Sequence, residues 1–228
     1  MSVEERLKSV EARIAEAASH SGRPPNAVRL VGVSKGMAPA LIVQAVAAGL
    51  QEVGENRVQE AGVKIPVVAS ELSTPPVWHL VGHLQSNKAR PALELFDTIQ
   101  SVDSVRIAQV LSRLAQQPVP VFLEVQFARA PDRFGFEPDA LLDPVDEIAR
   151  LPNMSIVGLM TVAPLGLSEE ETRRVFRTLR LRRDELLERR PRLGNLELSM
   201  GMTDDFAIAI EEGATVVRIG RAIFAEQG

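Results

Sequence analysis

A lysine at the end of an apolar run is the residue of this sequence best suited to covalent chemistry. Lys35 follows Arg29–Val33, in which four of the five positions are apolar or glycine. An amine at the end of a buried strand is partly desolvated, which raises its free-amine fraction and favours attack on an aldehyde to form a Schiff base. Most lysines, however, are solvated surface residues. Lys35 alone therefore leaves a Schiff-base role and a surface role open.

Two glycine-containing segments in the last part of the chain have the character of phosphate-binding loops. One is 198–202, which contains Gly201, and the other is 217–221, which contains Gly220. Glycine lets a backbone approach a ligand closely, and N–H groups in such loops and at helix starts bind phosphate. Each glycine alone is more typical of a turn. Together with Lys35, a phosphate site indicates the phosphorylated aldehyde pyridoxal 5'-phosphate (PLP) as a cofactor.

Further polar groups follow the second and third apolar runs. Asn56 lies in the segment 54–57, and His79 and His83 lie in 78–88. No acidic or thiol ligand stands near the histidines in sequence, so a metal site is disfavoured. The segment 177–192 holds seven arginines interleaved with acidic residues at helical spacing, which predicts a solvated helix face.

The chemically interesting residues stand at the ends of short β-branched runs, which are expected to be strands. Eight strands are predicted, at 28–33, 52–54, 77–81, 97–101, 119–126, 154–160, 195–199 and 215–219. Segments of helical period lie between them, at 39–49, 56–71, 85–94, 104–115, 138–150, 168–190 and 204–212. Strand and helix therefore alternate along the chain.

This alternation predicts a single (β/α)8 TIM barrel over residues 1–228, with an extra N-terminal helix at about 2–20. Ser2 and Glu5 form the capping box that begins the extra helix. The strands are apolar at most positions, as in a parallel sheet covered on both faces. A doubly wound open sheet is the rival, but no G-x-G-x-x-G follows the first strand. Barrels assemble their active sites at the carboxyl ends of the strands, where these polar groups would meet.

Composition excludes several classes of protein. The chain has 228 residues, of which 45% are hydrophobic and 25% charged, as in ordinary globular proteins. Its net charge of -4 argues against a nucleic-acid binder, and the absence of cysteine excludes disulfides and thiol nucleophiles. The N-terminus lacks the apolar core of a secretion signal, and the longest apolar run, 38–50, is too short to cross a bilayer. We expect a cytoplasmic protein that binds neither nucleic acid nor membranes.

Five segments together resemble the pyridoxal phosphate homeostasis protein family. They read VGVSKG, EVGENRVQE, WHLVGHLQSNK, GLMTV and LSMGMTDDFAIAIEEGATVVRIGRAIF, and they span almost the whole chain. The resemblance implies the barrel of fold-type III PLP proteins, like the N-terminal domain of alanine racemase. It implies an aldimine between PLP and Lys35, and Asn56 beside the cofactor. It also places Ser199, Met200 and Gly220 around the phosphate and Arg218 at the pyridine nitrogen.

Two positions depart from the family pattern. Arg221 stands where family members usually carry Thr or Ser, and Gln126 stands where Asn is common. We expect the backbone N–H groups of Met200, Gly220 and Arg221 to supply most phosphate contacts, so the change at Arg221 need not abolish binding. The Arg221 side chain has two possible positions, on the phosphate or out in solvent. The sequence does not choose between them.

The site as predicted is poorly equipped for catalysis. PLP withdraws electrons most strongly when a carboxylate protonates the pyridine nitrogen, and an arginine such as Arg218 leaves it unprotonated. A racemase also needs a second acid/base, which in the racemases is a tyrosine of a domain absent here. This chain contains no tyrosine, and His83 is a weak substitute.

The favoured function is therefore a non-catalytic one. We expect a monomer that binds PLP, buffers it and hands it to PLP-dependent apoenzymes, with no catalytic residue and no metal. A small PLP-dependent racemase or lyase is the first alternative, and would remove the α-proton of an amino acid. A class I aldolase is the second, and would use Lys35 without a cofactor in a colourless protein.

Overall fold

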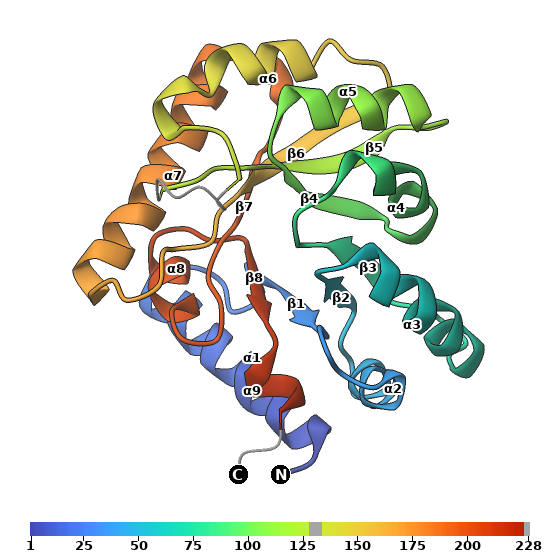
Figure 1. The fold of residues 1–228 in the computed structure, drawn as a ribbon. Coiled ribbons are helices and arrows are strands. Elements are labelled where there is room, and N and C mark those ends of the chain that lie inside the picture. Colours follow the sequence, from blue (N-terminus) through green and yellow to red (C-terminus); the bar gives the residue numbers. More distant parts are fainter. Residues whose placement is uncertain (128–133, 226–228) are drawn as a thin grey trace.

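The computed structural model describes residues 1–127 and 134–225, and its centre is a closed barrel of eight parallel strands (Figure 1). The strands follow one another around the barrel in chain order, from β1 to β8. Their bounds are β1 Arg29–Val33, β2 Glu52–Glu55, β3 Val77–Leu80, β4 Thr98–Val102, β5 Val119–Glu124, β6 Met154–Met160, β7 Glu197–Ser199 and β8 Val216–Ile219. The predicted (β/α)8 barrel is confirmed.

Helices surround the barrel and connect its strands (Figure 1). Their bounds are α1 Val3–His20, α2 Pro39–Ala47, α3 Val58–Glu71, α4 Ala89–Leu95, α5 Val105–Leu114, α6 Leu142–Ile148, α7 Glu169–Arg189, α8 Phe206–Glu211 and α9 Arg221–Phe224. Two predicted helices begin with a separate 3-10 turn, at Ser86–Lys88 and Pro138–Ala140. Within the described residues, no helix has the length and apolar character needed to cross a membrane.

The extra N-terminal helix closes one side of the barrel. The predicted capping box is present, because Ser2 Oγ accepts from the Glu5 N–H while the Glu5 carboxylate accepts from the Ser2 N–H. An apolar stripe that includes Leu7 and Val10 is buried, and α1 packs against α8 and α9. Arg6 adds a buried hydrogen bond, in which its Nε donates to the Ile223 carbonyl at 2.7 Å. The helix therefore anchors the last element after β8.

Most of the apolar core lies between the barrel and its helices. One large cluster of buried apolar side chains connects the outward faces of the strands with all the longer helices. The barrel interior holds a smaller apolar cluster of four residues, Val31, Phe122, Met160 and Val216. Polar side chains occupy other inward positions, including His79, Gln100 and Ser199, which are all buried. The interior of this barrel is therefore only partly apolar.

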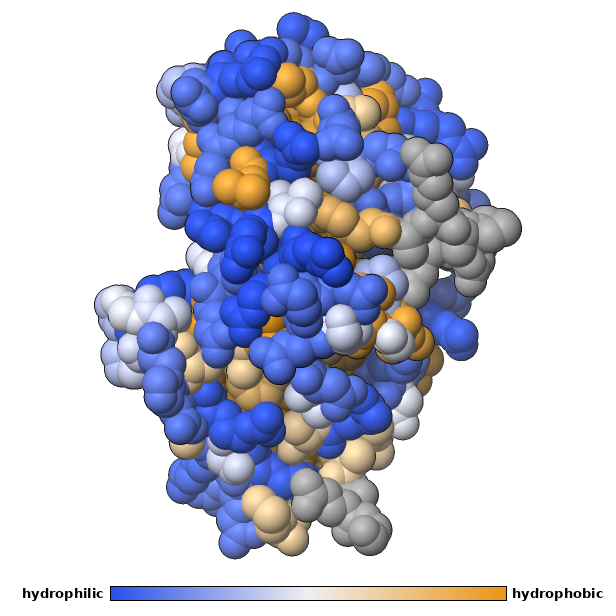
Figure 2. Space-filling model, turned by 90° about the vertical axis from the view of Figure 1, so that its left-hand side faces the viewer, coloured by the Kyte–Doolittle hydropathy of each residue, from blue (hydrophilic) through white to orange (hydrophobic). Residues whose placement is uncertain are grey.

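The arginine-rich helix α7 faces solvent and is also tied to its neighbour. The side of the molecule that carries α7 is mostly hydrophilic, with small separate apolar spots (Figure 2). Three arginines of α7, Arg173, Arg177 and Arg180, form ion pairs with the buried Glu212 after α8. Burial opposes ionisation of Glu212, but the hydrogen bond and charge of Arg177 outweigh it and lower the Glu212 pKa. The arginines thus add a tertiary contact that the periodic charge pattern did not predict.

Candidate functional site

A cavity of about 790 Å³ opens at the carboxyl ends of the strands, on the face where barrels bind their ligands. Five of the seven predicted site residues line it, namely Lys35, Asn56, Arg218, Gly220 and Arg221. Much of the remaining wall is formed by the segment 163–167 after β6 and the segment 202–205 after β7. The first of these segments was not predicted as a ligand contact, and the second overlaps the predicted loop 198–202 at Met202 and continues past it. The remaining two residues, Ser199 and Met200, are fully buried and do not line the cavity.

Lys35 lies in the turn that follows β1, and its side chain is exposed. The next residue, Gly36, has a φ of +75°, a left-handed conformation that glycine adopts without strain. The apolar run before Lys35 predicts a partly desolvated amine at the barrel mouth. The turn instead carries the amine beyond the end of the strand. A Schiff-base role for Lys35 is therefore supported by the exposure of its side chain and by the residues that line the cavity with it.

A buried ion cluster holds the turn that carries Lys35. The Lys64 amine on α3 donates to Glu55 Oε1 at 2.7 Å, to Glu60 Oε1 at 2.5 Å and to the Ser34 carbonyl at 2.7 Å. Ser34 Oγ donates to Glu55 Oε1 at 2.6 Å, and the Gly36 N–H donates to Glu60 Oε1 at 2.6 Å. The residues on both sides of Lys35 are thus fixed through side chains of β2 and α3.

The hydrogen bonds of this cluster favour the ionised form of Glu60. Burial opposes the ionisation of Glu60, but its hydrogen bonds with Lys64 and with the Gly36 N–H lower the Glu60 pKa below its ordinary value. This cluster was not predicted from the sequence. A signal was available, because Glu60 and Lys64 are spaced i,i+4 with the acid first, the favourable order on a helix.

Gly220 brings the end of β8 against the end of β1. A Cβ atom at Gly220 would lie 2.8 Å from the Val33 carbonyl oxygen, so a side chain does not fit there without movement. Among the described residues, the N–H groups of Gly220 and Arg221 have no hydrogen-bond acceptor. Two free donors on a glycine loop that lines a cavity are suited to an anion.

The predicted donor at Met200 is not available to a ligand. The Met200 N–H donates to the Val216 carbonyl at 3.1 Å, as part of the pairing between β7 and β8. The next candidate donor, the Met202 N–H, is also engaged, because it donates to Asp205 Oδ1 at 2.6 Å. The Met200 N–H is therefore already engaged in this structure, and Gly220 and Arg221 are the predicted donors that remain.

Arg218 lies at the floor of the cavity and is almost completely buried. Its Nη1 donates to Ser199 Oγ at 2.5 Å and its Nη2 donates to the Thr161 carbonyl at 2.7 Å. Burial lowers the pKa of Arg218 to about 10, against the favourable charges of Glu124 and Asp205. Burial also raises the pKa of Asp205, which lines the same cavity.

Arg221, the clearest departure from the family pattern, forms an ion pair with Asp204. Its Nη2 lies 2.5 Å from Asp204 Oδ2, and both side chains are largely exposed, at 74% and 78%. Of the two positions left open for this side chain, the structure therefore has the one in solvent.

The two histidines lie in different places. His79 is inside the barrel, whereas His83 is at the rim of a separate cavity of about 410 Å³. His83 Nδ1 lies 2.8 Å from Asp103 Oδ2, and its ring stacks on Phe134 at 3.7 Å between centroids. Among residues 1–127 and 134–225, no group of three or more potential ligands could hold a metal ion.

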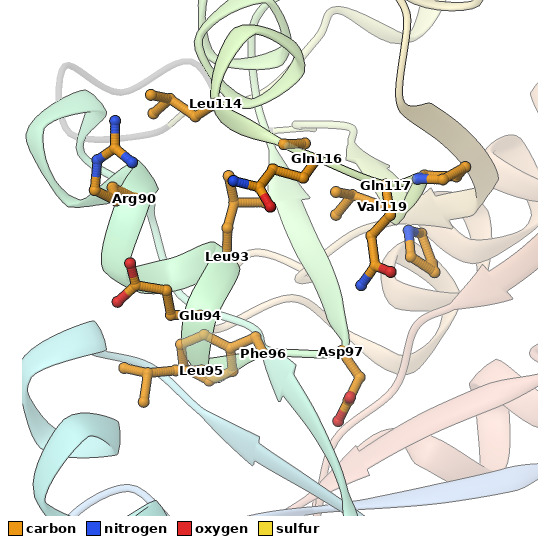
Figure 3. A pocket seen from close by; sticks show the side chains of 13 residues that line it. Arg90, Leu93, Glu94, Leu95, Phe96, Asp97, Leu114, Gln116, Gln117 and Val119 are labelled. Carbon is orange, nitrogen blue, oxygen red and sulfur yellow. The ribbon is translucent and has the colours of Figure 1, made fainter.

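Another hollow, of about 730 Å³, lies at the amino-terminal ends of β4 and β5 (Figure 3). Its wall includes Arg90, Glu94 and Asp97, together with Gln116 and Gln117 from the connection before β5. In barrels this face serves stability rather than chemistry. The cavity at the opposite end therefore remains the candidate site.

Comparison with known proteins identifies the family. A sequence model described as "Alanine racemase, N-terminal domain" matches residues 6–227. A pyridoxal phosphate homeostasis protein of Pseudomonas aeruginosa is 40% identical over 226 residues, which cover 97% of this chain and 94% of the relative. A protein of the same name from Aquifex aeolicus is 38% identical and covers 98% and 97%. The chain belongs to this family.

Solved structures agree with the family assignment. PipY of Synechococcus elongatus, in a structure with PLP bound, is 40% identical, has a TM-score of 0.85, and matches over 98% of this chain and 100% of that one. The alanine racemase of Clostridium difficile is 15% identical with a TM-score of 0.74, and the match covers 98% of this chain and 60% of the racemase. At this identity, the likeness to the racemase shows a shared fold alone.

Proposed function

We propose that this protein binds PLP in the cavity at the carboxyl ends of the strands, holds it covalently through Lys35, and buffers and delivers it without catalysing a reaction of its own. One observation carries the proposal. Lys35 and the free N–H groups of Gly220 and Arg221 line a single cavity, in a chain that is similar over almost its full length to a protein with PLP bound.

The residues of the cavity fit the parts of PLP. An exposed lysine amine suits the aldehyde, two free N–H donors suit the phosphate, and the Arg218 guanidinium suits the pyridine nitrogen as a hydrogen-bond donor. Three basic residues line the cavity beside three acidic ones, so the cavity is not acidic overall; the basic ones are Lys35, Arg218 and Arg221, and the acidic ones are Glu169, Asp204 and Asp205. When bound, PLP supplies an electron-withdrawing ring that stabilises negative charge on an attached amino acid.

Two features of the cavity favour a carrier over a catalyst. Arg218 is a donor-only group without a carboxylate's ability to keep the pyridine nitrogen protonated, which leaves a weak electron sink. His83 is the one group suggested as a substitute for the missing tyrosine, and it lines a different cavity. In this proposal the protein exchanges PLP with PLP-dependent apoenzymes and acts as a monomer.

A spectral titration tests the proposal. Protein freed of cofactor is titrated with PLP, and its visible absorption spectrum is recorded. We expect a colourless protein that becomes coloured at one equivalent, and that passes the cofactor to a PLP-dependent apoenzyme and restores its activity. A protein that stays colourless, but that a carbonyl substrate and borohydride modify at Lys35, would instead support the aldolase.

We predict that the PLP-loaded protein does not remove the α-proton of amino acids. Alanine or serine in deuterium oxide should gain deuterium at Cα no faster than with the same concentration of free PLP, because the electron sink is weak and His83, the suggested second base, lines a different cavity. Mass spectrometry of the amino acid measures the exchange. Rapid exchange with loss of stereochemistry would contradict the carrier function.

The racemase or lyase alternative has one specific observation in its favour. Asp205 lines the cavity, and burial raises its pKa, which is a property of catalytic acids and bases. If Cα exchange occurs, the Asp205→Asn variant decides between mechanisms. Loss of exchange in that variant would assign the base to Asp205.

We predict that the Arg221→Thr variant retains PLP affinity within about fivefold of the parent, because exposed ion pairs contribute roughly 0–1 kcal/mol and 1.4 kcal/mol corresponds to tenfold. Affinity is measured at low and high salt, with Arg174→Thr, an exposed arginine on α7, as the control for net charge. A tenfold weakening that salt reduces, absent in the control, would show that the Arg221 side chain contacts the phosphate instead.

A further inference from the structure

A continuous row of buried polar side chains crosses the barrel interior and ends at Arg218. Its members come from inward positions of five strands, and each residue is at most 9% exposed. They are Arg218 on β8, Ser199 on β7, Gln100 on β4, His79 on β3 and Glu52 on β2. Of these, Arg218 alone lines the candidate cavity.

Each member of the row touches the next. Arg218 Nη1 donates to Ser199 Oγ at 2.5 Å, and Ser199 Oγ donates to Gln100 Oε1 at 2.6 Å. Gln100 Nε2 lies 3.1 Å from His79 Nδ1, and His79 Nε2 lies 3.1 Å from Glu52 Oε2. Glu52 then pairs with Arg29 at the amino-terminal end of the barrel, at 2.7 Å.

The chemistry of the Arg218 end fixes the direction of the three hydrogen bonds that lead to His79. Arginine only donates, so Ser199 Oγ accepts from Arg218 and has its own proton free for Gln100 Oε1. The amide nitrogen of Gln100 therefore faces His79 Nδ1 and donates to it. With Nδ1 as the acceptor, the ring proton belongs on Nε2, which lies 3.1 Å from Glu52 Oε2 in a close contact that lacks hydrogen-bond geometry. The hydrogen bonds thus have one consistent direction, from Arg218 to His79, and the contact with Glu52 is electrostatic.

Charge at the far end reinforces this direction. Burial opposes ionisation of Glu52, but the contacts with His79 and Arg29 outweigh it and lower the Glu52 pKa. An ionised carboxylate at one end of a buried row strengthens each bond along it, because aligned hydrogen bonds polarise one another. The guanidinium at the other end has little freedom, since its second bond goes to the Thr161 carbonyl.

Packing alone does not explain these residues. Barrel interiors are ordinarily filled with branched apolar side chains, and burying polar groups is costly unless each is hydrogen-bonded. We propose that Ser199, Gln100, His79 and Glu52 are positioning residues that hold the Arg218 guanidinium at the floor of the cofactor cavity. The inference rests on the proposed function only in that Arg218 faces PLP.

The role of Ser199 is changed by this inference. The family resemblance placed it around the phosphate, but both of its side-chain hydrogen bonds lie inside the barrel. Its contribution to the cofactor would therefore act through Arg218.

The first test needs no cofactor. The chain has three histidines, so nitrogen NMR of the imidazole rings resolves each one. We expect His79 Nδ1 to accept from Gln100 with the ring proton on Nε2, and a slowly exchanging Arg218 guanidinium. In Gln100→Leu and in the smaller change Ser199→Ala, the guanidinium protons should exchange at least about tenfold faster, as befits the loss of hydrogen bonds that are strengthened by charge. A proton on His79 Nδ1, or unchanged exchange in both variants, would overturn the inference.

Ser101→Ala is the matched control. Ser101 is a buried residue of the same strand as Gln100, and its Oγ donates to the Gly82 carbonyl, outside the row. This variant loses one buried hydrogen bond but should leave the Arg218 guanidinium and His79 unchanged. Thermal unfolding of every variant verifies that it is folded.

The second test uses PLP. Gln100→Leu should weaken PLP binding about tenfold or more and shift the visible absorption maximum of the bound cofactor, as expected when bonds to a charged group are disturbed. Gln100→His should restore both, because a neutral imidazole offers one acceptor for Ser199 and one donor for His79. A parent-like affinity and spectrum in Gln100→Leu would refute the positioning role. If the parent itself fails to bind PLP, the proposed function is wrong, and the cofactor-free test still decides whether the row positions Arg218.

Discussion

Replacing Lys35 with alanine should abolish covalent attachment of PLP to this protein. The parent is expected to gain the mass of one reduced cofactor after PLP and borohydride, whereas Lys35→Ala should gain none. The reason is that Lys35 is the lysine that lines the candidate cavity in the described part of the chain. Intact-protein mass spectrometry measures the gain, and peptide mapping assigns it to a residue.

The other lysines provide the controls for this experiment. Lys88→Ala removes an amine that does not line the cavity and should leave trapping unchanged. Lys64 should not react, because its amine already donates to two carboxylates and a carbonyl. Reduced cofactor found on Lys64 or Lys88 of the parent would show that the assignment to Lys35 is wrong.

The architecture was largely predictable from the sequence. The mostly apolar strands and their regular alternation with helices predicted the eight parallel strands, and strand ends differed from prediction by only a few residues, as at Glu197–Ser199 against 195–199. Strand order and burial are properties of local sequence and of general packing rules. This is why the gathering of Lys35, Asn56 and Gly220 around one cavity could be anticipated.

Details of the site depended on contacts between distant segments, which sequence patterns do not record. The Met200 N–H donates to the Val216 carbonyl because Ser199 pairs with Val216 in the sheet. Arg221 forms an ion pair with Asp204, because the loops after β7 and β8 bring these two side chains together. The absence of acidic residues near His79 and His83 in sequence was also misleading, since Glu52 and Asp103 reach them across adjacent strands.

Replacing Lys64 with methionine should produce the largest loss of stability among the changes considered. Methionine fills a similar volume but leaves Glu55 and Glu60 without their cation. Breaking a buried ion pair by removing one partner costs about 3–5 kcal/mol, because a charge is left buried and uncompensated. We expect the free energy of unfolding, measured with urea, to fall by about 3 kcal/mol at pH 7.

Lys8→Met is the matched control for Lys64→Met. Lys8 also pairs with a glutamate four residues before it, Glu4, but that pair is on the surface of α1 with side-chain exposures of 67% and 59%. Exposed pairs of this kind contribute about 0.3–0.5 kcal/mol. Equal losses in the two variants would show that the Lys64 cluster has no special weight in stability.

The pH dependence separates loss of charge compensation from loss of packing. Lys64 lowers the pKa of Glu60, so its stabilisation of the parent is present above the ordinary glutamate pKa of 4.5 and is lost as the pH falls through the lowered value. The difference in stability between the parent and Lys64→Met should therefore be largest near pH 7 and shrink in acid. A difference that stays constant from pH 7 to about pH 3 would mean that Lys64 acts through packing.

Because Glu60 also accepts from the Gly36 N–H, the Lys64→Met variant should trap PLP on Lys35 more slowly at pH 7 even where it is folded.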